Sequence, residues 1–182
     1  VDTHMTKNVE WGAVAYLAHS KFGLNGVEIG INANSIFKTG IGNDGSSIYN
    51  TEIGENSSTT KNVYGIYDMS GGGWEYTAAC YKTMGAIKLT ENTNSNYINK
   101  YVDVYEEYGP SKYGDAIYET SSSDAGSNSW FLSYSCFVFE ERPIFERGGS
   151  YFNDPYAGLF YFGYYNGERN YNDGFRPVCI VK

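Results

Sequence analysis

The stretch NVYGIYDMSGGGWEYTAAC, residues 62–80, is the most informative part of the sequence for predicting the fold. Apolar and aromatic side chains stand on both sides of a glycine triplet, at Val63, Ile66, Met69, Trp74 and Tyr76. Glycine adopts the backbone conformations that a tight turn requires. The stretch therefore predicts a turn between two core-facing segments.

Upstream of this stretch, residues 8–22 show the spacing of one helix face. The apolar positions that define this face are Val9, Ala13, Val14 and Leu17, with Trp11 and Ala18 beside them. Thr6 or Asn8 can cap the start of this helix, and Gly23 can close it. His19 lies in its last turn, where the helix dipole favours a cation, so a structural role is expected for this histidine.

The remaining segments predict short strands joined by long loops. Residues 24–61 contain turn signals and predict a surface excursion, whereas helical spacing over residues 97–108 predicts a second helix. Residues 109–129 are predicted as loop, followed by strands over residues 130–138, 144–152, 158–162 and 175–181. Without an internal repeat or a linker, we expect a single domain over residues 1–182. Its class is α+β, irregular and loop-rich, with one or two helices and short antiparallel strands.

The charge of the chain argues against two classes of partner. The 182 residues include 13 basic and 21 acidic side chains, a net charge of -8, and neither sign forms a long run. Nucleic acids and anionic membranes both require clustered Lys and Arg, so neither is expected as a partner. No apolar run approaches the roughly 20 residues that cross a bilayer, so no membrane insertion by this chain is predicted.

The reactive side chains do not form a recognisable catalytic pattern. Cys80, Cys136 and Cys179 are far apart, which predicts three buried thiols, with one disulfide and a free thiol as the alternative. His4 falls in a predicted tail, so His4 and His19 make a weak zinc pair. No GxSxG motif occurs, and the pairs Glu106-Glu107 and Glu140-Glu141 are predicted to be solvated.

No cofactor is therefore expected, with calcium as the alternative. Several aspartates could supply oxygen ligands, although no EF-hand spacing is present. These candidates are Asp44, Asp68, Asp124, Asp154 and Asp173.

Aromatic residues are concentrated between Phe145 and Phe175 in a number that one pair of strands cannot bury. Alternation predicts that Phe160 and Phe162 point inward. Tyr164, Tyr165 and Tyr171 fall among turn residues and are expected to be exposed together. Tyr, Ser, Gly and Asn are the residues that binding loops use, so a recognition surface is predicted between Arg147 and Arg176. These two arginines are predicted to be paired and structural, and Trp11, Trp74 and Trp130 are assigned to the core.

Three motifs resemble one known family. NVYGIYDMSGGGWEYT, RGGSY with GFRPV, and VEWGAVAYL are similar to the central, closing and helical motifs of the formylglycine-generating, or sulfatase-modifying-factor, branch of the C-type lectin fold. The resemblance implies a C-type lectin-like fold from Val9 onward. The oxidase of that family uses a cysteine pair near its C-terminal end, and residues 156–174 contain no cysteine. The resemblance therefore does not imply an enzyme.

A closer resemblance covers residues 147–178. RGGSYFNDPYAGLFYFGYYNGERNYNDGFRPV is similar to the terminal variable region of proteins diversified by retroelements in phages and bacteria. Adenine-directed mutation of Asn-rich codons in such regions produces Asn, Tyr, Asp, Ser, Phe and Gly. The resemblance implies that the displayed, ligand-binding residues are Tyr151, Asn153, Asp154, Tyr156, Gly163, Tyr164, Tyr165, Arg169, Tyr171 and Asp173. It implies that the framework residues are Gly148, Gly149, Gly158, Phe160, Gly174, Phe175 and Arg176.

The function implied by this resemblance is receptor recognition outside the cell. The expected partner is a protein or glycan ligand on another cell or particle, and the expected location is extracellular, on a bacterial surface or a phage virion. Two alternatives remain open. One is a catalytically altered sulfatase-modifying-factor-like enzyme, and the other is a structural tail or pilus subunit that packs against its own neighbours.

Overall fold

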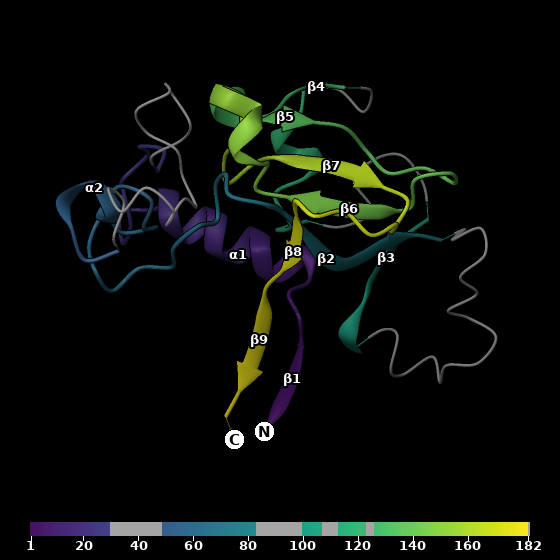
Figure 1. Cartoon of the computed structure of the whole chain (residues 1–182), viewed down its shortest axis with the longest axis horizontal. Helices are drawn as coiled ribbons and strands as arrows, with labels where there is room; N and C mark the ends of the chain where they lie inside the picture. Colours follow the sequence, from purple (N-terminus) through teal and green to yellow (C-terminus); the bar gives the residue numbers. More distant parts are fainter. Residues whose placement is uncertain (30–48, 83–99, 107–112, 123–125, 182) are drawn as a thin grey trace.

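The chain forms a mixed α+β structure of short strands, one long helix and extensive loops, in agreement with the predicted class (Figure 1). The computed structural model describes residues 1–29, 49–82, 100–106, 113–122 and 126–181. Predictions that concern the other residues, including those for Asp44, Asp124 and Glu107, lie outside the described residues. In the described part, no helix is both long and apolar enough to span a membrane.

The predicted first helix is present as α1, Asn8–His19. Its N-cap is Lys7 rather than Thr6 or Asn8, and the backbone N–H of Lys7 donates to Glu10 Oε2 at 2.9 Å. The helix ends at Ser20, before Gly23. The predicted buried face is wrong, because Trp11 and the small residues face the core while Leu17 is 60% exposed.

A glycine determines how closely α1 approaches its neighbours. A Cβ atom on Gly12 would lie 2.2 Å from the carbonyl oxygen of Gly114. The helix therefore packs directly on the backbone of residues 114–115 through a position that carries no side chain. Apolar periodicity alone does not reveal this contact, because glycine has no hydrophobic side chain to count.

A mixed sheet of seven strands forms the centre of the molecule, in the order β3-β2-β6-β7-β5-β4, with β8 also paired to β2. Its strands are β2 (Trp74–Tyr81), β3 (Asp103–Tyr105), β4 (Ser127–Asn128), β5 (Tyr134–Ser135), β6 (Ile144–Arg147), β7 (Phe162–Tyr165) and β8 (Asp173–Phe175). The prediction of an antiparallel sheet is only partly right. β2 pairs antiparallel with β6 but parallel with β3 and β8, and β5 pairs parallel with β7.

Several predicted elements differ from the structure. The second predicted helix, over residues 97–108, is only partly right, because Lys100 and Tyr101 are helical but β3 follows over Asp103–Tyr105. The predicted strand over residues 130–138 is a 3-10 turn, Trp130–Leu132, followed by the short β5. The strand predicted to reach residue 152 ends at Arg147, and a 3-10 helix over Tyr151–Tyr156 follows. Tertiary packing overrode these local patterns, because the preference of aromatic residues for strands depends on their surroundings.

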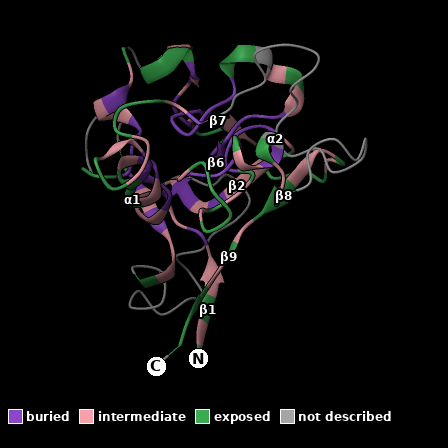
Figure 2. Cartoon of the chain, turned by 90° about the vertical axis from the view of Figure 1, so that its left-hand side faces the viewer, coloured by how far each residue is buried: buried purple, intermediate pink, exposed green. Residues whose placement is uncertain are grey.

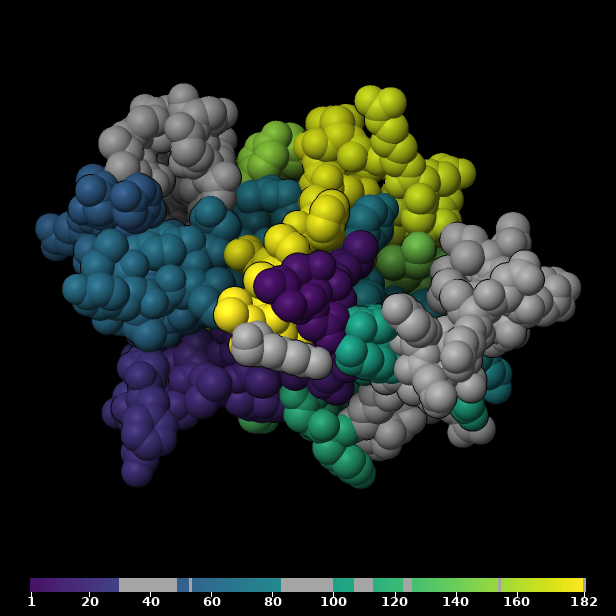
Figure 3. All heavy atoms as spheres, turned by 90° about the horizontal axis from the view of Figure 1, so that it is seen from below, coloured from purple at the N-terminus to yellow at the C-terminus, as the bar shows by residue number. Residues whose placement is uncertain are grey.

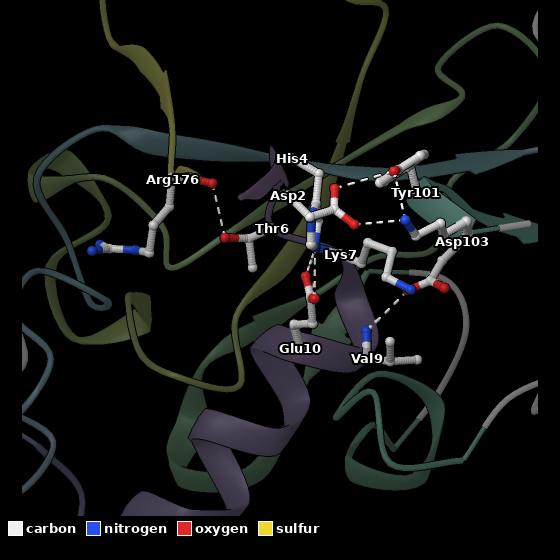
Figure 4. A network of polar contacts seen from close by, with 10 residues as sticks. Asp2, His4, Thr6, Lys7, Val9, Glu10, Tyr101, Asp103 and Arg176 are labelled. Atoms are coloured by element: carbon white, nitrogen blue, oxygen red, sulfur yellow. Dashed lines mark hydrogen bonds and ion pairs between the residues drawn. The ribbon is translucent and has the colours of Figure 1, made fainter. Parts of the chain in front are cut away.

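The two ends of the described chain pair with each other. β1 (Asp2–Met5) and β9 (Pro177–Ile180) form an antiparallel ribbon, and both ends lie side by side in two views (Figures 1 and 3). Thr6 Oγ1 donates to the carbonyl oxygen of Arg176 at 2.8 Å (Figure 4). His4 Nε2 lies 2.7 Å from Glu10 Oε1, so the prediction that His4 lies in a tail is wrong.

Two groups of buried side chains form the core, and Figure 2 colours the buried residues along the ribbon. The first joins α1 to the segment before β7, through Trp11, Ala15, Ala18, Ile29, Met69, Ala116, Leu159 and Phe160. The second fills one side of the sheet, through Ala79, Tyr105, Ile117, Phe137, Val138, Phe145 and Phe162. Phe160 and Phe162 are buried as predicted, and Leu159 and Tyr161 are buried as well, so this segment is covered on both faces.

Other burial predictions are corrected by the structure. Only Cys80 is buried; Cys136 is half-buried, Cys179 is exposed, and all three thiols are free. Trp130 is 47% exposed, so it is not a core tryptophan. Val63 and Ile66 are exposed, because the segment before the glycine triplet runs over the surface. The solvent exposure predicted for Glu140 and Glu141 is confirmed.

The structural role predicted for both arginines is confirmed. Arg147 is fully buried and donates from Nη1 and Nη2 to the carbonyl oxygens of Asp115 and Ala116, both at 3.0 Å. Arg176 forms an ion pair with Glu75. The first arginine joins the sheet to residues 115–116, and the second joins the start of β9 to β2.

Candidate functional site

A pocket of about 240 Å³ opens at the sheet, beneath the aromatic C-terminal segment. Its lining comes from four parts of the chain: β5, β6, the 3-10 helix, and β7 with the residue before it. The lining residues are Tyr134, Glu146, Asn153, Tyr161, Gly163 and Tyr164. Asn153, Gly163 and Tyr164 were predicted from the sequence as ligand-binding residues. The structure brings these three together with three residues that the prediction missed.

The register of the sheet explains why a pocket forms here. Glu146 on β6 is paired with Tyr76 on β2 and with Gly163 on β7. Paired residues of neighbouring strands share a face of the sheet, so the side chain of Glu146 stands beside a position without a side chain. A Cβ atom on Gly163 would lie 3.2 Å from the Tyr161 hydroxyl oxygen. Gly163 thus leaves the space that Tyr161 and the pocket occupy.

Two tyrosines form an aromatic wall of the pocket. The ring centroids of Tyr134 and Tyr161 are 5.6 Å apart. Trp74 Nε1 donates to the Tyr161 hydroxyl oxygen at 3.1 Å, which fixes the position of this buried ring. Burial raises the pKa of both phenols well above the ordinary value. Both hydroxyls are therefore uncharged at neutral pH, and Glu146 supplies the carboxyl group of the pocket lining.

Glu146 is a buried carboxyl group without an internal partner. Its residue is 6% exposed, and it makes no hydrogen bond or ion pair with the described residues. Burial raises its pKa to about 8; the charge of Asp173 also raises it, and that of Arg142 lowers it. A carboxyl group that titrates this far from its ordinary range is typical of functional sites.

A second carboxyl group lies close to this pocket on β8. Asp173 Oδ2 accepts a hydrogen bond from the Tyr76 hydroxyl at 2.6 Å. Asp173 Oδ1 is buried and has no hydrogen-bond partner in the described part of the chain. The Tyr76 ring lies 6.1 Å from the ring of Tyr165, which connects this carboxyl group to the aromatic segment. The surroundings of the pocket are therefore aromatic and acidic.

The residues predicted for display fall into three groups by exposure. Tyr156, Arg169 and Tyr171 are exposed, and Tyr171 is the most accessible at 89%. The half-buried ones are Tyr151, Asn153, Tyr164, Tyr165 and Asp173. Gly163 is buried but lines the pocket, and the side chain of Asp154 is outside the described part.

The expectation that Tyr164, Tyr165 and Tyr171 are exposed together holds only for Tyr171. Tyr164 packs against Phe139, with ring centroids 5.0 Å apart, and the Arg142 guanidinium lies 5.2 Å from its ring centroid. Among the predicted framework residues, Gly174 and Phe175 are exposed instead of buried. β7 and β8 end near the surface. The alternation of residues along a strand does not reveal where the strand reaches the surface.

The pocket residues missed from the sequence were Tyr134, Glu146 and Tyr161. Only Glu146 carries a local signal, as an acidic residue within the strand Ile144–Arg147. An acidic residue within a strand suggests either a surface position or a buried functional one. The structure shows that the position is buried, because β2 and β7 flank β6 on both sides.

Replacing Glu146 with Gln is expected to stabilise the fold at alkaline pH. The native pKa of about 8 lies above the ordinary 4.5, so between these values the native state binds more protons than the unfolded state. Stability of the wild-type chain therefore falls as pH rises through this window. One pKa unit corresponds to about 1.4 kcal/mol, so a rise from 4.5 to about 8 means that E146Q should gain up to roughly 5 kcal/mol at about pH 9 and little at about pH 4.

Urea denaturation across this pH range measures the effect. Glu140→Gln, at an exposed carboxyl group just before β6, is the matched control and should retain the wild-type pH dependence. An E146Q variant whose stability declines with pH as steeply as that of the wild-type chain would contradict the assignment of a raised pKa to this residue.

Two further findings concern metal ligation and similarity to known proteins. The described ranges contain no group of three or more His, Cys, Asp or Glu side chains placed to hold a metal ion. No protein-family model, no curated protein and no solved structure matches the chain. The proposed function therefore rests on the pocket and its surroundings.

Proposed function

We propose that this protein is a recognition protein that binds its ligand through the aromatic surface around the Glu146 pocket, on a C-type lectin-like scaffold. The observation that carries this proposal is the convergence of Asn153, Gly163 and Tyr164 on one pocket. These residues come from the segment whose composition is typical of binding loops. The proposal extends to a variable protein of a diversity-generating retroelement, displayed on a bacterial surface or a phage.

The physical properties of the surface support recognition of a ligand. Tyr156 and Tyr171 are 50% and 89% exposed, and each ring offers contact area with few rotatable bonds. The backbone beneath them is fixed by buried framework positions, including Gly148 and Gly149. Both glycines have positive φ, at 79° and 69°, a conformation that other residues rarely adopt. Rigid support reduces the entropy lost on binding.

Substitution of exposed residues tests this surface without disturbing the core. The variant Tyr156→Ala/Arg169→Ala/Tyr171→Ala should remain folded and lose at least about tenfold in affinity, because exposed aromatic and arginine side chains dominate such interfaces. The control is Tyr64→Ala/Tyr113→Ala, which removes rings that are 92% and 80% exposed outside the segment. Binding of labelled protein to a printed glycan array and to a panel of intact bacterial cells is the measurement.

The outcome that contradicts the proposal is equal binding by the wild-type chain, the triple variant and the control on every glycan or cell that binds. Diversification is tested separately by sequencing the last hundred or so bases of the gene in many clones and searching nearby for a near-identical copy. Differences confined to adenines of that copy support diversification. An invariant segment without such a copy contradicts it.

A further inference from the structure

We propose that the Glu146 pocket binds the ammonium head group of an organic cation, with the Glu146 carboxylate as counter-ion and the rings of Tyr134 and Tyr161 as the aromatic wall. This inference rests on the proposed function and names the ligand class of the same site. It depends on three properties of the pocket: its unpaired buried carboxyl group, its aromatic wall and its size.

The carboxyl group supplies the charge. Glu146 is 94% buried, lines the pocket and lacks any ion pair or hydrogen bond with the described residues. Folding has already removed most of the water from this group, so a cation that enters meets a desolvated partner. The Coulomb attraction between two charges at contact is several-fold larger in such an environment than in bulk water. The pocket therefore favours the binding of a positively charged group.

The charged and titratable groups around Glu146 favour the same sign of ligand. Asp173 on β8 adds negative charge, and burial raises the pKa of the Tyr76, Tyr134 and Tyr161 phenols, which keeps these three uncharged at neutral pH. Arg142, before β6, is the positive group that acts on Glu146, and its guanidinium lies over the Tyr164 ring. The neighbouring phenols are Tyr76 on β2, Tyr134 on β5, and Tyr161 and Tyr164 at β7. The net charge of -8 also attracts cations from a distance.

The aromatic wall and the size of the pocket narrow the ligand to an alkylated ammonium head. An ammonium group over a tyrosine face is attracted by the ring quadrupole, and more strongly when water is excluded. Tyr134 and Tyr161 tilt toward each other with centroids 5.6 Å apart and an interplanar angle of 38°. A cavity of about 240 Å³ is smaller than the sites that hold drug-sized molecules, which favours a compact head group.

The test uses two probes of the same shape and different charge. Choline carries a quaternary ammonium group, and 3,3-dimethylbutan-1-ol replaces its nitrogen with carbon. Neither probe titrates, so any pH dependence of binding comes from the protein. Titration calorimetry or NMR chemical-shift titration of the whole chain at about pH 6 and about pH 9 gives the dissociation constants.

Choline is expected to bind at least about tenfold more tightly at about pH 9 than at about pH 6, because Glu146 ionises between these values. At the higher pH it should also bind at least about tenfold more tightly than the neutral alcohol. Glu146→Gln should remove both preferences, and this variant is expected to fold. Glu140→Gln should keep the wild-type values, since this carboxyl group is exposed outside the pocket.

Equal binding of the two probes, or choline binding that E146Q leaves unchanged, would overturn the inference. That result leaves the recognition surface intact as long as the triple variant with Tyr156, Arg169 and Tyr171 replaced still loses binding to cells or glycans. Conversely, charge-selective binding by the wild-type chain combined with full cell or glycan binding by the triple variant would overturn the proposed function and leave the pocket as a cation site.

Discussion

Replacing Arg147 with Met is expected to destabilise the fold by about 3–5 kcal/mol, the cost typical of removing one partner from a buried charged network. Arg147 is fully buried, and two carbonyl oxygens accept its hydrogen bonds at 3.0 Å. Asp115 lies close enough for its charge to favour the charged guanidinium. Met preserves length and apolar volume but leaves both carbonyl groups unpaired and removes the positive charge that acts on the Asp115 carboxylate.

The hydrogen-bond network around Arg147 enlarges this effect. The Tyr105 hydroxyl donates to Asp115 Oδ2 at 2.6 Å, and Asn8 Nδ2 donates to the same hydroxyl oxygen at 3.2 Å. The Arg147 guanidinium therefore compensates the charge of Asp115. Through the Tyr105 hydroxyl, this carboxylate is linked to β3 and to the start of α1. Chemical denaturation of R147M is the measurement, with Arg169→Met at an exposed position as the control. A loss below about 1 kcal/mol for R147M would show that the network does not depend on this charge.

Replacing Trp11 with Ala is expected to cost about 3–5 kcal/mol, the range for truncating a buried aromatic residue. Trp11 is fully buried, and its Nε1 donates to the Leu159 carbonyl oxygen at 2.8 Å. The Arg147 guanidinium lies 5.5 Å from its ring, so the substitution also removes a contact of that buried charge. A large cavity and an unpaired carbonyl group would remain beneath α1.

Trp130→Ala provides the matched comparison for Trp11. Trp130 is 47% exposed, although its ring contacts Tyr16 and Phe160. Its loss should cost about 1 kcal/mol, because a partly exposed ring buries less apolar area. Thermal unfolding of both variants separates the two positions. Equal losses would contradict the assignment of Trp11 to the core and Trp130 to the surface.

The mixed α+β class and the first helix could be predicted from local sequence patterns. A period of 3.6 residues and helix-compatible ends are properties of neighbouring residues, so they are visible without tertiary structure. The buried face of α1 could not be predicted in the same way. This face includes Gly12, where α1 closely approaches the backbone of residues 114–115. Hydrophobicity scales do not identify such a contact, because glycine has no apolar side chain.

The sequence also indicated which segment carries the candidate site. The rings and turn residues between Arg147 and Arg176 predicted a recognition surface, and Asn153 and Tyr164 do line the pocket. The prediction missed Tyr134 and Glu146, because these residues reach the pocket through strand pairing. β5 and β6 both flank β7, and no short-range pattern specifies which strands become neighbours.

The sequence by itself determined the balance of charge, the α+β class, the position of α1 and the concentration of tyrosines in the C-terminal segment. These properties depend on composition and on residues close together in the chain. Only the tertiary structure decided that Glu146 lies buried beside Gly163, that Arg147 is enclosed by backbone carbonyl groups, and that β1 pairs with β9. The physical reason is that burial and charge pairing depend on contacts between residues distant in sequence, whose partners are chosen by the packing of the whole chain.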